Sequence, residues 1–151
     1  MGTTNRSEIL TNRLNRNRSK SRSLALQTLF EIDLTEHHVD DVLNNLMVES
    51  DLDKDYLDFT RNIVYGVISK QKQIDYLISQ CATERHVGDL SPLDRSVLRM
   101  GILELIDFPD TPPKVVVNEV VELAKIYGSD NSYKFVNGVL GAVLSKLKIK
   151  E

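Results

Sequence analysis

The chain has 151 residues, of which 41% are hydrophobic and 27% are charged, and its formal net charge is −3. This is a one-domain length, and no apolar run approaches the roughly 20 residues that a bilayer-spanning helix needs, so we expect no membrane association. Cys81 is the only cysteine, which excludes an internal disulfide and a cysteine-cluster metal site.

The first 22 residues form a basic segment ahead of an acidic body. This segment has six basic residues and one acid and carries +5, so the rest of the chain carries −8. Residues 1–17 are too polar to order a core, and we expect a flexible arm there, followed by a single helical domain over residues 18–151. An arm of this charge predicts contact with a polyanion. Its basic residues are Arg6, Arg13, Arg16, Arg18, Lys20 and Arg22.

From Ser19 onward the apolar residues recur with the period of an α-helix. Strand-like alternation competes only at Lys114–Val117, where the flanking capping residues favour a helix. We therefore expect an all-α fold. The predicted helices cover about residues 19–34, 39–48, 54–81, 92–108, 112–127 and 131–147, where Asp51 or Asp53 caps the third helix and Ser129 or Asp130 caps the last.

Capping residues mark several helix boundaries. Ser91 and Pro92 fit the N-cap and the first position of the fourth helix, which is apolar on nearly all sides and is expected in the interior. Thr111 is expected to cap the fifth helix in the same way. Gly128 is expected to end that helix in the left-handed conformation that favours glycine.

The sequence carries no pattern typical of catalysis or metal binding. Gly138 and Gly141 lie inside a predicted helix without the Lys-Ser/Thr pair of a phosphate-binding loop. His37, His38 and His86 lack the i, i+4 partner of a helical zinc site. We therefore expect no enzymatic activity, no cofactor and no metal.

Two regions have the composition of a nucleic-acid contact. One is the basic segment where it enters the first helix, and the other is the turn from Tyr127 to Phe135, which offers aromatic rings, hydroxyls, an amide and a lysine. Such mixtures bind single-stranded RNA, because bases stack on the rings while amides and N–H groups bond base edges and phosphates. The sequence leaves two alternatives open: the two rings pack in the core, or the arm only improves solubility.

Four segments, in order and at matching spacing, resemble motifs of the NusB family of transcription antitermination factors. They are R-x-x-A-x-Q-x-L-[FY] at residues 22–30, L-D-R-x-x-L-R at 93–99, N-E-x-[IV]-E-L-A-K-x-[FY]-G at 118–128, and S-x-K-F-V-N-G-[VI]-L at 132–140. The resemblance extends over residues 18–147. The chain departs from the family in its longer arm before Arg22 and in Gly141, where the family often has an acid.

The single cysteine, expected to be a buried thiol, fits a reducing cytoplasm. The resemblance implies two packed helical subdomains of about three helices each, and a non-catalytic protein that binds single-stranded boxA RNA. It implies a protein partner, the small-subunit ribosomal protein NusE, and entry into the RNA polymerase elongation complex through other Nus factors, mainly on ribosomal RNA operons. The family includes monomers and homodimers. Carried over by position, partner contact falls to Asp94 and Arg95. RNA contact falls to Arg18, Lys20, Arg22, Gln27, Tyr127, Asn131, Ser132, Lys134 and Phe135.

The runner-up interpretation is a helical protein-interaction adaptor without RNA specificity. In that case the basic arm would affect only solubility, and its removal would leave partner binding intact. A third interpretation comes from the ribosomal RNA methyltransferases that carry a NusB-like domain. Their α/β catalytic portion has no counterpart in these 151 residues.

Overall fold

The structure, a computed structural model, describes residues 5–150, without the side chains of residues 11–13 and 15. Over that range the chain is helical and contains no strand, so the all-α prediction is confirmed. One 3-10 turn, η1 (Val87–Asp89), separates the third and fourth helices. The helices are α1 (Arg6–Leu34), α2 (Val39–Glu49), α3 (Lys54–Cys81), α4 (Pro92–Asp107), α5 (Pro113–Tyr127) and α6 (Ser132–Lys146).

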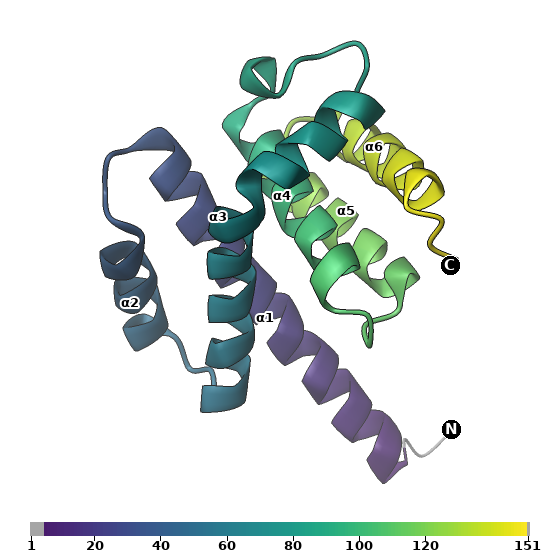
Figure 1. The fold of residues 1–151 in the computed structure, drawn as a ribbon. Coiled ribbons are helices and arrows are strands. Elements are labelled where there is room, and N and C mark those ends of the chain that lie inside the picture. The colour runs from purple at the N-terminus through teal and green to yellow at the C-terminus, as the bar shows by residue number, and fades with distance from the viewer. Residues whose placement is uncertain (1–4, 151) are drawn as a thin grey trace.

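The helices form two packed groups, and α3 extends through both (Figure 1). In one group α1 packs against α2 and the first half of α3, and in the other α4 packs against α5 and α6. Helix α3 joins the groups because it bends at Lys70, whose backbone leaves the helical region (φ −110°, ψ 16°). The expected arrangement of two helical subdomains is confirmed.

Helix α4 lies at the centre, as the apolar residues on nearly all its sides predict. Val97, Leu98 and Ile102 have no exposed surface, and the Ser91 hydroxyl caps the helix by accepting a hydrogen bond from the Asp94 N–H at 3.1 Å. Helix α3 comes close to α4 at Gly66, where an added Cβ would lie 2.7 Å from a methyl carbon of Leu103. The interior position of α4 is therefore confirmed.

The first helix begins well before the expected boundary near Ser19. Asn5 caps it, since the Asn5 side chain accepts the N–H of Glu8 at 2.9 Å, and the helix then runs without interruption to Leu34. The C-terminal half of α1 is packed against the body and provides a formed helix. Each residue added ahead of it contributes a further backbone hydrogen bond, so the helix extends readily to the cap. Its first turns project beyond the body (Figure 1). The Arg13 side chain lies outside the described part of the structure.

Two other boundaries also differ from the sequence-based expectation. Gly128 ends α5 with an extended backbone (φ −96°, ψ −174°) and is not left-handed. Glycine fits there because an added Cβ would lie 2.6 Å from the carbonyl oxygen of Ala124. Pro112, and not Thr111, occupies the N-cap of α5. No helix in the described part of the chain has the length and apolar content that a bilayer crossing requires.

Candidate nucleic-acid interface

Arg22, predicted to contact RNA, lies in the protein interior. Its guanidinium is 2% exposed and donates from Nε and Nη2 to the two carboxylate oxygens of Glu104, at 2.8 and 2.9 Å. Its Nη1 lies 3.9 Å from Glu119. A buried arginine in a two-pronged contact with a carboxylate holds α1 against α4. The prediction of an RNA contact at Arg22 is therefore not met in this structure.

The other two predicted cations of α1 lie on opposite sides of the helix. Arg18 lies over the ring of Phe59 on α3, with its guanidinium carbon 5.3 Å from the ring centre. Lys20 is exposed and lies 3.3 Å from a carboxylate oxygen of Asp51. Gln27 follows Lys20 by seven residues, which places both on one face of α1. Lys20 and Gln27 can therefore contact one ligand, whereas Arg18 faces elsewhere.

Gln27 and Tyr127 line the same surface pocket, although they are a hundred residues apart in the sequence. The remaining lining is apolar and comes from Leu26 and Phe30 of α1 and from Leu93 at the start of α4. We call these five residues the Tyr127 pocket. Tyr127 is 51% exposed, so its ring is available to a ligand.

The turn between α5 and α6 leads away from this pocket. Ser132, predicted to contact RNA, is buried, and its hydroxyl accepts the Ser129 N–H at 3.1 Å, so it braces the turn. Asn131 precedes α6 as its N-cap residue and is exposed. Asn131 therefore remains available to a ligand, while Ser132 positions the turn that presents it.

Phe135 lies in a second concave site, a groove between the end of α3 and the first turns of α6. The Arg85 guanidinium carbon lies 4.6 Å from the centre of the Phe135 ring. Lys134 is exposed at the groove edge, and the Cys81 thiol lies at its α3 end. Burial raises the pKa of the Cys81 thiol, although Lys146 opposes the shift, so Cys81 is not an activated nucleophile. We call this site the Phe135 groove, lined by Cys81–Arg85, Lys134, Phe135, Gly138 and Val139.

The two predicted partner contacts, Asp94 and Arg95, lie next to the Tyr127 pocket in sequence, directly after Leu93. Arg95 is engaged within the protein, since its Nη2 donates to Asp33 at 2.6 Å and its Nη1 donates to the carbonyl of Val87 at 3.1 Å. Asp94 is buried, and among the described residues its Oδ1 has no hydrogen-bond partner. Arg95 thus joins α1, η1 and α4, whereas Asp94 retains an unpaired acceptor.

Sequence reasoning missed several residues of these sites. Arg85 lies in the irregular segment after α3, where no periodic pattern places a side chain. Leu26, Phe30 and Leu93 have the helical spacing of core residues, and that spacing does not show that they line a surface pocket. A signal did exist for the interior ion pair, because Glu104 lies between the apolar residues Leu103 and Leu105 of a helix expected in the interior, and a buried acid calls for a cationic partner.

Across the described residues, no group of three or more histidine, cysteine, aspartate or glutamate side chains is arranged to hold a metal ion. The two concave sites instead combine rings, amides and cations, and the α5–α6 turn joins them. This arrangement can stack planar groups and bind phosphates.

Comparison with known proteins gives a consistent match. The NusB family profile matches residues 19–145. The chain is 40% identical over 136 residues to the transcription antitermination protein NusB of Chloroflexus aggregans, covering 89% of this chain and 91% of that protein. The structure of T. maritima NusB superposes with a TM-score of 0.80 at 31% identity, covering 85% of this chain and 91% of that one. A complex of antitermination factors NusB and NusE with dsRNA gives a TM-score of 0.79 at 27% identity, covering 87% and 98%.

The matched region includes both concave sites and excludes the first turns of α1. The family consists of non-enzymatic transcription antitermination factors that bind RNA. Sequence identity of 40% over nine-tenths of a relative indicates a common family. A shared helical architecture alone would not, because proteins of unrelated function can have the same fold. The chain belongs to the NusB family of transcription antitermination proteins.

Proposed function

We propose that the chain binds single-stranded boxA RNA together with NusE. The main observation in support is that the short α5–α6 turn joins the Tyr127 pocket to the Phe135 groove. Each site presents an aromatic ring, and an amide or a cation lies beside it. Bases stack on aromatic rings, and cations bind the phosphates between them. The family's solved complex with NusE and dsRNA supports RNA and NusE as ligands, while the single-stranded boxA form of the RNA is part of the proposal.

The RNA contacts fall to six members of the predicted set, of which all but the half-buried Phe135 are exposed. They are Lys20, Gln27, Tyr127, Asn131, Lys134 and Phe135, with Arg85 added from the structure. Arg18 contributes at most a peripheral charge, because it faces α3. Arg22 and Ser132 act indirectly, by fixing α1 and the α5–α6 turn.

The partner protein NusE is assigned to the Tyr127 pocket. Its apolar walls, Leu26, Phe30 and Leu93, suit an aliphatic or aromatic side chain of a protein better than a phosphate. The Asp94 carboxylate oxygen that has no hydrogen-bond partner among the described residues is buried one residue beyond Leu93, so NusE does not reach it in this structure. Tyr127 and Gln27 are exposed in this pocket, so RNA and NusE would meet there, and direct contact between the two ligands would make their binding cooperative.

In the cell, we expect the protein to act in the cytoplasm. Bound to RNA and NusE, it would join an elongation complex of RNA polymerase through other Nus factors, mainly on ribosomal RNA operons. The competing function is a protein adaptor without RNA specificity. The two functions make different predictions for the aromatic rings of Tyr127 and Phe135. Removing these rings lowers the affinity for RNA only if the protein is an RNA-binding factor.

Titration of a fluorescent boxA RNA tests the proposal. Phe135→Ala and Tyr127→Ala should each weaken RNA binding by about 1–3 kcal/mol, or roughly 5- to 150-fold, because each removes one base-stacking ring. Tyr76→Ala is the control, since Tyr76 is 62% exposed on α3 and lines neither site. Unchanged RNA affinity in both folded variants would leave the adaptor as the better account.

A further inference from the structure

We propose that the RNA strand continues beyond the Phe135 groove along the outer face of α6, from Lys134 to Ser145 and Lys146. This inference rests on the proposed function and names a segment of its RNA path. The groove leads onto α6 because Gly138 is part of its lining. The observations behind the extension are the charge of this part of the chain, the alignment of its exposed residues and the open space above two glycines.

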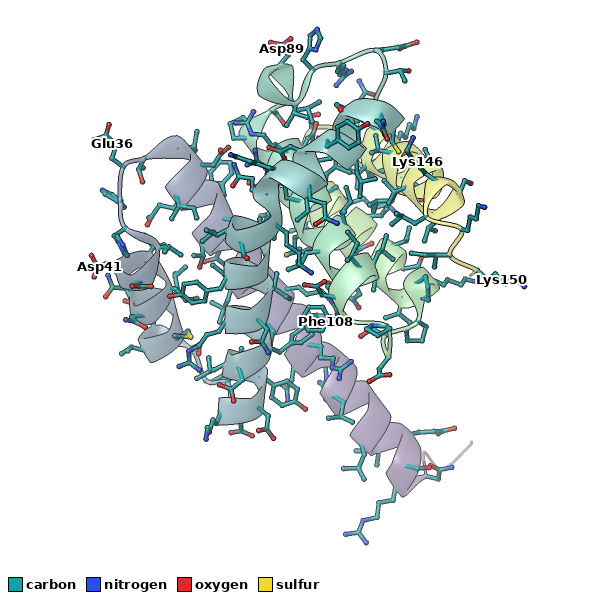
Figure 2. All side chains as sticks on the ribbon, in the orientation of Figure 1. Glu36, Asp41, Asp89, Phe108, Lys146 and Lys150 are labelled. Carbon is teal, nitrogen blue, oxygen red and sulfur yellow. The ribbon has the colours of Figure 1, made fainter. Side chains whose placement is uncertain are left out.

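The charged side chains from the last residue of the α5–α6 turn to the end of the described chain are all lysines, although the same turn also contains Asp130. Residues 131–150 contain four lysines and no acid, although the whole protein is acidic. Figure 2 shows Lys146 and Lys150 at one side of the molecule, and the acids Glu36 and Asp41 at the opposite side. Arg85 adds a further cation at the groove, where Glu84 is the one acid of the lining. A polyanionic strand is therefore the occupant that this surface complements.

The exposed residues of α6 line up along the helix. Lys134, Gly138, Gly141 and Ser145 follow one another at i, i+4, i+7 and i+11, so they share one face, and all four are exposed. This line is about 16 Å long at 1.5 Å per residue. That length matches about five stacked nucleotides of a strand.

The two glycines allow a close approach that the fold itself does not need. A Cβ added to Gly138 or Gly141 would meet nothing within 4 Å, in contrast to Gly66 and Gly101, which are packed against neighbouring helices. An unpacked glycine weakens a helix interior relative to alanine. Because Gly138 and Gly141 have no side chains, a sugar-phosphate backbone can lie close to α6 there, between Lys134 at one end and Lys146 at the other.

The chain after α6 keeps further lysines on the same part of the surface. Lys148 has a left-handed backbone (φ 55°), and Ile149, which is half-buried, donates its N–H to the carbonyl of Leu144 at 2.9 Å. This anchored turn holds the tail against the body and leaves Lys148 and Lys150 exposed. The hydrogen bond of Ile149 thus fixes the position of the lysines at this end of the proposed RNA path.

The experiment compares two RNAs, a short boxA oligonucleotide and the same oligonucleotide extended by about six nucleotides on either end. The extended RNA should bind more tightly to the unaltered protein. Gly138→Ala and Gly141→Ala should each raise the melting temperature by about 2–4 °C and yet weaken binding of the extended RNA by about fivefold or more. Lys146→Gln should reduce the slope of log affinity against log salt by about 0.7, since one phosphate contact is lost. Gly88→Ala and Lys54→Gln are the controls, because both residues lie off α6.

The outcomes separate this inference from the proposed function. If the unaltered protein binds neither RNA, both are wrong. If it binds both RNAs equally and the α6 variants bind the extended RNA as tightly as the controls do, the path along α6 is wrong while the proposed function stands. If the glycine variants lose NusE binding and keep RNA binding, the face belongs to a protein partner and the RNA path is overturned.

Discussion

The interior ion pair between Arg22 and Glu104 leads to the sharpest test of the structure. Their two hydrogen bonds are 2.8 and 2.9 Å long, and the side chains are 2% and 0% exposed. Removing one partner of such a pair leaves an uncompensated buried charge and costs about 3–5 kcal/mol. For a chain of this length that loss lowers the melting temperature by roughly 10–15 °C. We therefore expect Arg22→Met to be strongly destabilised.

The same change should leave RNA affinity unaltered when binding is measured well below the melting temperature. The double variant Arg22→Met/Glu104→Leu should recover much of the lost stability, because well-packed apolar residues often replace a buried ion pair at little cost. Thermal unfolding followed by circular dichroism, together with RNA titration of each variant, gives both quantities. A melting temperature within about 2 °C of the unaltered protein, combined with a large loss of RNA affinity, would refute the interior assignment of Arg22.

Three further predictions concern local features. Gly128→Ala should destabilise the fold by about 1–3 kcal/mol, since its Cβ would press on the Ala124 carbonyl, and a urea midpoint equal to that of the unaltered protein would contradict this. Cys81 should react with iodoacetamide more slowly than a free thiol at pH 8, because burial raises its pKa, and bound RNA should slow the reaction further. The Tyr65 hydroxyl donates a hydrogen bond to Asp40, which raises the pKa of Tyr65 above 10.0. This contribution to stability is present below about pH 10 and is lost as the pH rises through the folded pKa, so Tyr65→Phe should lower the urea midpoint at pH 8 and have less effect at higher pH.

The sequence allowed prediction of the helices with strong periodicity and of the central position of α4. These features follow from the spacing of apolar residues alone, which buried faces require. The start of α1 at Arg6 could not be predicted in this way. Its first turns bury little surface, with Leu10 and Leu14 each more than half exposed, so they leave no periodic pattern of burial. A polar cap at Asn5 and continuity with the packed half of the helix extend it instead.

The candidate site was predicted as a set of residues, but the sequence did not indicate their roles. Tyr127 and Phe135 are exposed or half-exposed in two different concave sites. Arg22 and Ser132 have the same residue types as nucleic-acid contacts, but tertiary packing directs them inward. The difference depends on partners distant in the sequence, such as Glu104, and a motif read along the chain does not reveal them.

The proposed joint recognition of boxA RNA by this protein and NusE can be measured directly. The experiment determines the affinity of a labelled boxA RNA and of a scrambled RNA of equal composition, each with and without NusE, at one salt concentration. We expect boxA RNA to bind more tightly than the scrambled RNA, and NusE to increase this difference. Equal affinity for the two RNAs in both conditions, with NusE bound normally, would contradict it.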